Sequence, residues 1–260
     1  MMTRYLVAAA VAAPALVAAQ SPITAGSVKV GEPSKIAEID TDRMKGQPSR
    51  LAWSPDGSQL YVQMLEGPFQ APTRLTHHTF AIKDGKKKDV EGEPEWVSPY
   101  WTAKSGQASP DSAAFKIELK SEVRKERTVS APMGGDLARG GGAGGDGGTS
   151  SAGDALAAAY NQQPVPVNTM LLHGEVIGEF INSVIVPGLT FGWGPKGSHA
   201  IAYSAKNGRV VLMDEKGNTQ EIAGTKESLL PSWSPDGSKL AWLQKDGRKK
   251  YVLQVADVTR

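Results

Sequence analysis

Cysteine is absent from the 260-residue chain. A disulfide framework and a cysteine-based zinc site are therefore both excluded. Net charge is also small, because 29 Lys and Arg residues against 27 Asp and Glu leave a formal charge of +2. Nucleic-acid-binding domains usually gather basic residues on one face, and this near balance of charges does not indicate such a basic surface. We expect no nucleic-acid partner, and nothing in the composition indicates a cofactor.

Long apolar runs are missing after the N-terminus. The N-terminus itself has a short positive region at 1–4, an alanine-rich apolar segment over 5–17 and small residues up to Ala19. This is the pattern of a secretory signal peptide, and the segment is shorter than the roughly 20 apolar residues of a membrane span. We predict a signal peptide over 1–19, an N-terminal extension over 20–34, a periplasmic or secreted location and no membrane span. An uncleaved N-terminal anchor is the alternative.

A short motif recurs along the chain. The sequence Trp-Ser-Pro-Asp-Gly-Ser occurs at 53–58 and again at 233–238. A looser copy begins at Trp193, and a degenerate copy begins at Tyr100-Trp101 and continues with Ser-Pro-Asp-Ser at 109–112. In this unit the tryptophan ends a short strand, and a tight turn follows because proline fixes φ and glycine accepts a positive φ.

The residues after each turn have the pattern of strands. Leu60, Val62 and Met64 alternate with their neighbours and fall on one face. Further short apolar runs end at hairpin-type turns at 84–85 and 215–217. Four short strands per unit, repeated about every 40–45 residues, are typical of a propeller blade.

We therefore predict an all-β fold, a β-propeller of four-stranded antiparallel blades over residues 35–260. The repeat gives four blades, at about 50–91, 97–182, 189–223 and 229–260. The last has only three strands of its own, so the segment Lys35–Ile39 is expected to complete it and remove an open sheet edge. Five blades, or part of a larger propeller, are the alternatives.

Glycine is concentrated in one stretch of the predicted second blade. Residues 133–153 hold ten of the 29 glycines. Such a segment buries too little apolar surface to offset its ordering entropy. The alanine-rich residues 154–163 that follow are predicted to form a short helix capped by Asp154. We expect a Gly-rich disordered insertion over 133–165.

The Trp-Ser-Pro-Asp-Gly copies resemble the repeat of TolB-like (WD40-like) propellers and of the propeller domains of prolyl oligopeptidase relatives. These families use the propeller as a platform, on which TolB docks envelope proteins and the peptidases position a hydrolase domain. The resemblance implies a non-enzymatic module that binds a protein or an envelope component. We expect it to act as a monomer.

Two ends of the predicted propeller differ in their loops. One end carries the repeated turns, and the other carries the glycine-rich insertion and longer, less repetitive loops from 43–49, 66–78 and 93–100. Function concentrates in loops that a rigid scaffold positions, so the second end is the expected binding face. The candidate binding residues in these loops are Phe69, Arg74, His77, Trp96 and Tyr100.

An enzyme is the alternative function, either a hydrolase or a carbohydrate-active protein with its site at the channel mouth. A glycosidase needs paired carboxylates, and Glu66, Glu93 and Glu95 are the loop acids near that mouth. A nucleophile elbow reads Gly-x-Ser-x-Gly, whereas the nearest segment here, 149–153, lacks the first glycine. No catalytic residue is predicted.

No metal site is predicted. The four histidines lack the spacing of helical metal ligands, and calcium needs six to eight oxygens. Asp56 and Asp236 are each nearly alone in their turns and are expected to bond the local backbone instead. The tryptophans that recur with the repeat are expected in the core: Trp53, Trp101, Trp193 and Trp233.

Overall fold

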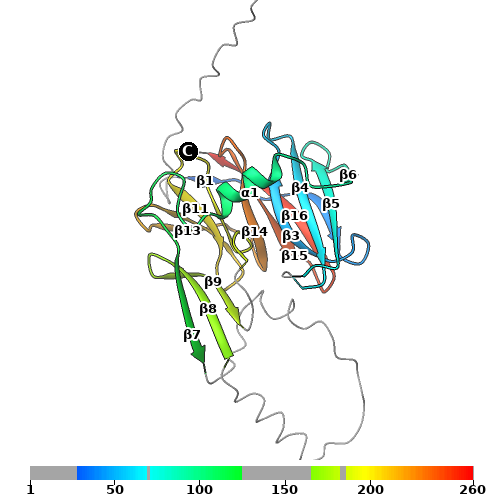
Figure 1. Ribbon diagram of the computed structural model, residues 1–260. Coiled ribbons are helices and arrows are strands. Elements are labelled where there is room, and N and C mark those ends of the chain that lie inside the picture. Colours follow the sequence, from blue (N-terminus) through cyan, green and yellow to red (C-terminus); the bar gives the residue numbers. More distant parts are fainter. Residues whose placement is uncertain (1–27, 69–70, 125–164, 182–185, 260) are drawn as a thin grey trace, which may run out of the picture.

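The computed structural model describes residues 28–68, 71–124, 165–181 and 186–259. Within these ranges the chain is mostly β-strand, and its strands form four antiparallel sheets accompanied by one helix (Figure 1). The predicted all-β class is confirmed. The predicted signal peptide (1–19), the glycine-rich stretch at 133–153, the helix predicted over 154–163 and Phe69 lie outside the described residues.

The first sheet is a meander in which each strand pairs with the next. Its strands are β3 (Gln47–Trp53), β4 (Gln59–Glu66), β5 (Arg74–Ala81) and β6 (Lys87–Val90). They agree with the first predicted unit, and alternation along β4 buries Leu60, Val62 and Met64 in the main hydrophobic core as expected. The other face of β4 carries Tyr61 and Gln63, which form part of the site described below.

The third sheet repeats this order. Its strands are β10 (Phe191–Trp193), β11 (Ala200–Ser204), β12 (Val210–Asp214) and β13 (Thr219–Glu221). The middle strands β11 and β12 are buried along their whole length. Their run of apolar residues is what a strand with both faces covered requires.

The fourth sheet joins the two ends of the described chain. Its own strands are β14 (Ser228–Trp233), β15 (Lys239–Lys245) and β16 (Lys250–Thr259). Two N-terminal strands, β1 (Lys29–Val30) and β2 (Ser34–Asp40), pair antiparallel with β16. The buried Ile39 lies opposite Tyr251. The predicted pairing of the segment Lys35–Ile39 with the last sheet is confirmed.

The two full copies of the repeat make the same turn. Asp56 accepts hydrogen bonds from Ser54 Oγ (2.6 Å), Ser58 N (3.1 Å) and Ser58 Oγ (2.7 Å). Asp236 makes the same three bonds, at the same distances, with the corresponding serines. The bonds from Ser54 and Ser58 lower the pKa of Asp56 to about 2. The turn-forming role predicted for both aspartates is confirmed.

The degenerate copy of the repeat departs from the prediction, because Trp101 lies on a helix and does not end a strand. The helix is α1 (Val97–Ser105). Val97, Tyr100, Trp101 and Lys104 recur at the i, i+3, i+4, i+7 spacing of one helical face. Pro99 falls in the first turn, where a helix tolerates proline because the missing N–H has no partner there. A central strand would lose a ladder hydrogen bond at this residue.

The second sheet also departs from the predicted four-stranded unit at 97–182. It has three strands, β7 (Glu118–Arg124), β8 (Val165–Leu172) and β9 (Glu175–Ile181). In the other sheets the first strand of the unit lies innermost, but here the last strand, β9, is the one that contacts β11 of the third sheet. β7 forms the far edge (Figure 1), and its Leu119 and Val123 are exposed.

Helix α1 lies among the innermost strands of three sheets. It contacts β3 and β10, and β14 contacts both of these strands as well. The Tyr100 hydroxyl donates to the carbonyl oxygen of Trp233 (2.6 Å), and Lys104 Nζ donates to Ser232 Oγ (2.7 Å). Burial raises the pKa of Tyr100, so its hydroxyl stays protonated as a donor. The helix is thereby attached to the last two residues of β14, directly before the repeat turn of the fourth sheet.

Buried tryptophans link neighbouring elements at the same centre. Trp53 Nε1 donates to the carbonyl oxygen of Ser232 (2.9 Å), and Trp193 Nε1 donates to that of Gly106 (2.6 Å). Trp233 is as buried as Trp53, yet its Nε1 has no hydrogen-bond partner among the described residues. The core placement predicted for these three tryptophans is confirmed.

Candidate functional site

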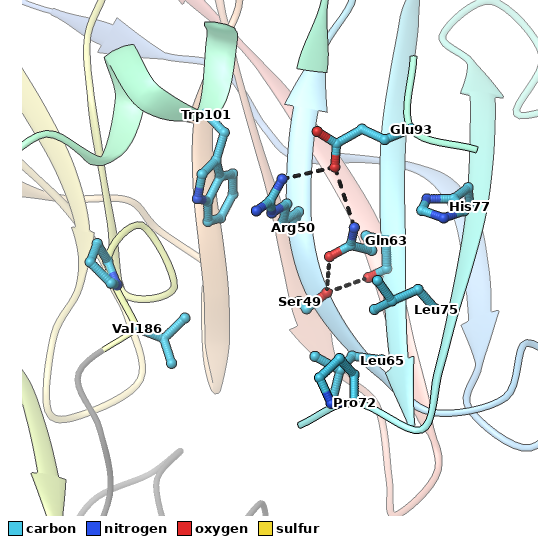
Figure 2. Close-up of a pocket in the computed structure, with 11 residues that line it drawn as sticks. Ser49, Arg50, Gln63, Leu65, Pro72, Leu75, His77, Glu93, Trp101 and Val186 are labelled. Carbon is cyan, nitrogen blue, oxygen red and sulfur yellow. Dashed lines mark hydrogen bonds and ion pairs between the residues drawn. The ribbon is translucent and has the colours of Figure 1, made fainter. Parts of the chain in front are cut away.

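A pocket of about 630 Å³ opens on the face of the first sheet that carries Tyr61 and Gln63 (Figure 2). Strands β3, β4 and β5 form one wall, Trp101 of α1 another, and the segment before β10 a third. The lining residues are Ser49, Arg50, Gln63, Leu65, Pro72, Leu75, His77, Glu93, Trp101, Val186 and Pro187.

Strand register places the lining residues side by side. Gln63 of β4 lies directly opposite Arg50 of β3 and His77 of β5, so the three share one face. The next pair on that face is Leu65 and Leu75. The ladder between β3 and β4 shifts register between Pro48 and Arg50, which brings Ser49 into the pocket beside Arg50.

A chain of hydrogen bonds fixes the polar end of the pocket. Arg50 Nη1 donates to Glu93 Oε2 at 2.8 Å, and Gln63 Nε2 donates to the same oxygen at 3.3 Å. Ser49 Oγ donates to Gln63 Oε1 at 2.9 Å. Gln63 is only 7% exposed, so its amide is held with the oxygen toward Ser49 and the nitrogen toward Glu93. The guanidinium and the carboxylate compensate each other's charge.

Tyr61 and His77 continue this chain. Tyr61 Oη lies 2.6 Å from His77 Nδ1, and Gln63 Nε2 donates to Tyr61 Oη at 3.4 Å. Burial raises the pKa of Tyr61, so the hydroxyl keeps its proton and donates it to Nδ1. Burial also lowers the pKa of His77, which keeps the ring neutral at pH 7. The remaining proton of the neutral imidazole is therefore on Nε2, which is left as a donor.

The other end of the pocket is apolar. Leu65, Pro72, Leu75 and Val186 line it at a distance from Glu93 (Figure 2). Leu75 is 42% exposed, which makes it one of the exposed large hydrophobic residues in the described part of the chain. The pocket thus combines an aliphatic end with a polar end of fixed geometry.

Trp101 stands beside the polar end. The guanidinium carbon of Arg50 lies 5.6 Å from the centroid of its ring, within the range of a cation–π contact. Lys104 Nζ also lies over this ring, at 4.6 Å. The sequence placed Trp101 in the core, whereas it is half-buried and lines the pocket. Trp101 reaches the pocket because it lies on a helix, α1, which contacts β3 of the first sheet.

The predicted binding residues lie in different surroundings, and only some of them are near the pocket. His77 lines the pocket. Arg74 is exposed on β5 opposite Glu66 and is not a lining residue. Trp96 precedes α1, half-buried, with its ring edge-on to Tyr61 at 6.1 Å. Tyr100 packs against the core, and its hydroxyl donates a hydrogen bond to the backbone carbonyl of Trp233.

Sequence reasoning missed Ser49, Arg50 and Gln63 as lining residues. A signal for them was present, because Tyr61 and Gln63 alternate with Val62 and Met64 along one predicted strand. Buried polar residues on one face of a strand need hydrogen-bond partners, and this points to a polar network. Of the three loop acids considered for an enzyme, Glu93 lines the pocket, whereas Glu66 and Glu95 are exposed outside it.

Other classes of site receive no support within the described ranges. There, no group of three His, Asp or Glu side chains is arranged to hold a metal ion. The same part of the chain contains no helix long and apolar enough to cross a membrane.

Comparisons with known proteins give distant structural likenesses. No protein-family model matches the chain, and no curated protein matches it. Among solved structures, it is similar to an acylaminoacyl peptidase in complex with Z-Gly-Gly-Phe-chloromethyl ketone, at 13% identity and a TM-score of 0.23. That alignment covers 78% of this chain and 29% of the peptidase.

A second likeness is to an oligogalacturonate lyase in complex with manganese, at 9% identity and a TM-score of 0.23. It covers 81% of this chain and 65% of the lyase. The chain thus spans less than two thirds of either protein. At these TM-scores neither likeness carries an argument about fold or activity.

Proposed function

We propose that the chain is an exported, TolB-like β-propeller module that binds a protein or envelope component through the pocket on its first sheet, without catalysing a reaction. Its four sheets are taken as four blades, the second of them irregular and accompanied by α1. The proposal is supported by the N-terminal strand that pairs with the last sheet and by the identical turns of the two full repeats.

The observation that carries the binding proposal is the preformed polar array beside exposed apolar surface. Arg50, Glu93 and Gln63 are already bonded to one another, so no side chain has to be ordered when a ligand arrives. Preorganisation of this kind reduces the entropy cost of binding. Leu75 at the other end supplies apolar surface that a partner would remove from water.

Site-specific photo-crosslinking tests the proposal. The photoreactive residue benzoylphenylalanine replaces Leu75 in the pocket, or Leu119 on β7 as the matched control. Both are leucines on strands, exposed by 42% and 56%. Irradiation in cells of the source organism should yield a discrete adduct from position 75 alone, in the periplasmic or secreted fraction.

The adduct must then be reproduced with purified components. The captured protein should bind the unmodified chain, and Leu75→Asp should weaken this binding at least about tenfold, or roughly 1.4 kcal/mol. Equal adducts from both positions, or no adduct at position 75, contradict the proposal. A chain found only in the cytoplasmic fraction contradicts its export.

A further inference from the structure

The charges that line the pocket are balanced. Arg50 contributes one positive charge and Glu93 one negative charge, and their side chains are 34% and 24% exposed. His77 is neutral at pH 7. An acidic or basic ligand group would be attracted by one member of the pair and repelled by the other, and its own charge would stay uncompensated in a partly desolvated site, which is costly. The pocket therefore favours an uncharged ligand.

The polar end still offers both donors and an acceptor. Arg50 has N–H groups beyond the one that reaches Glu93, and His77 has its Nε2–H. In the described contacts Glu93 uses Oε2 for both of its bonds, which leaves Oε1 as an acceptor. A peptide group carries one acceptor and one donor, so it complements this set without bringing charge.

The apolar end distinguishes a peptide from a saccharide. Its wall is aliphatic, formed by Leu65, Leu75 and Val186 with prolines beside them. Hydroxyl groups placed against this wall would lose their hydrogen bonds to water without replacement. A large apolar side chain would instead gain about 25 cal/mol for each Å² that it removes from water.

From this arrangement we infer that the pocket receives one large apolar side chain of an extended, uncharged peptide segment, whose neighbouring peptide group bonds to Arg50 and Glu93. The inference rests on the proposed binding function and names the chemistry of the partner segment. A single residue in extended conformation offers both parts, an anchor side chain and an adjacent backbone amide, to the two ends of the pocket.

Selection from a random peptide library tests the inference. Phage-displayed peptides are selected on the immobilised full-length chain and counted by sequencing, in parallel with the variants Leu75→Asp and Leu119→Asp. Peptides that need the pocket should be depleted on Leu75→Asp and retained on Leu119→Asp. Their shared feature should be one leucine, methionine, phenylalanine or tryptophan flanked by uncharged residues.

Synthetic peptides from the selection then test the two ends of the pocket. In fluorescence anisotropy, replacing the anchor by alanine and replacing a flanking residue by glutamate should each weaken binding at least tenfold. The same loss is expected for the intact peptide on Arg50→Gln, because that variant removes the guanidinium N–H groups that would bond to the peptide and leaves the charge of Glu93 unbalanced. Circular dichroism spectra that match the wild type show that the variants are folded.

Several results would overturn the inference. Selected peptides rich in aspartate or glutamate would show that Arg50 binds anions on its own. If the same peptides are enriched on Leu75→Asp, or if no peptide is enriched at all, the pocket does not bind a peptide. Binding of neutral oligosaccharides that Leu75→Asp abolishes would assign the pocket to another ligand. These results leave the crosslinking test of the proposed function standing, because that test makes no assumption about the chemistry of the partner.

Discussion

Trp53 and Trp233 hold the same position in the repeat and are each about 1% exposed, but they differ in hydrogen bonding. Trp53 Nε1 donates to the carbonyl oxygen of Ser232, whereas Trp233 Nε1 has no partner in the described part of the chain. Burial of the indole is therefore what the two positions share. The hydrogen bond is specific to the contact between the first and fourth sheets.

This difference predicts unequal effects of one substitution. Trp→Phe removes the same volume at both positions, but only Trp53→Phe also removes a buried hydrogen bond, the one to the carbonyl oxygen of Ser232. We expect Trp53→Phe to reduce the free energy of unfolding by about 1 kcal/mol more than Trp233→Phe does. Urea denaturation followed by circular dichroism measures both, and Trp233→Phe is the volume-matched control. Equal losses would contradict the assigned hydrogen bond.

At this scale the sequence predicted part of the site. The roles of Asp56 and Asp236 followed from local turn chemistry. His77 was predicted in a binding loop, whereas it lies within β5 and lines the pocket from there. Arg50 and Trp101 were not predicted as lining residues. The position of Arg50 depends on an irregularity in strand pairing, and that of Trp101 depends on the face of a helix. A repeat motif predicts neither feature.

Helix α1 places the amine of a lysine in the centre of the molecule. Lys104 is 3% exposed, and the contacts described for its Nζ are Ser232 Oγ and the Trp101 ring, with no carboxylate among them. Burial in these surroundings holds the pKa of Lys104 well below its usual range. The amine is thus more acidic in the folded chain than in the unfolded chain, where its pKa is about 10.4.

The sign of the resulting pH dependence follows from proton counts. Between the two pKa values the unfolded chain binds one proton more, so the stability of the fold rises as pH increases toward 10. Lys104→Met keeps the approximate length of the side chain and removes the titrating amine, and with it this contribution to the pH dependence of stability. We expect the variant to be more stable than the wild type at pH 7, with the difference shrinking as the pH rises toward 10.

Chemical denaturation of both chains at pH 7, 8, 9 and 10 checks this expectation. The difference between the two chains isolates Lys104, because other groups titrate in both. A variant that is less stable at every pH, or a difference that does not change with pH, would show that Lys104 is held as a stabilising cation.

Elements were predictable where alternation and turn chemistry agreed. The first, third and fourth sheets follow the motif, since its turn and the alternating strand after it are both local features. The second unit failed because the motif there is degenerate, while Val97, Tyr100, Trp101 and Lys104 have helical spacing. The helical period and the repeat motif compete in this segment, and the helical period is the one that the structure follows.

The whole molecule is held together by pairing between its first and last strands. β2 pairs with β16 along most of its length, and Glu38 lies opposite Val252. Pairing over such a separation was predictable from the missing strand of the last unit. The irregular second sheet was not predictable, since its position depends on the contact of β9 with β11 of the third sheet.

A disulfide provides a test of this pairing, because the chain has no cysteine of its own. The double variant Glu38→Cys/Val252→Cys should form an intramolecular bond on mild oxidation. Chain-entropy theory gives about 5 kcal/mol of stabilisation for a loop of this length, so the melting temperature should fall on reduction. Mobility in non-reducing electrophoresis and thermal melts with and without reductant measure the outcome.

The control is the pair Glu38→Cys/Gln254→Cys. Gln254 lies opposite Lys35 in the register, so these two positions are diagonal, too far apart for a disulfide without backbone movement. Efficient bonding of the control pair, or failure of the matched pair, would show that the register is wrong.

The same pairing sets the order in which the polypeptide acquires its structure. Ser34 Oγ bonds to the carbonyl oxygen of Val255, 221 residues further along. During synthesis the early strand has no partner until the ribosome has added the residues of β16, and contacts between such distant residues form slowly. A nascent chain therefore keeps an unfinished sheet until β16 has been made. Translocation of an unfolded chain would be compatible with this delay.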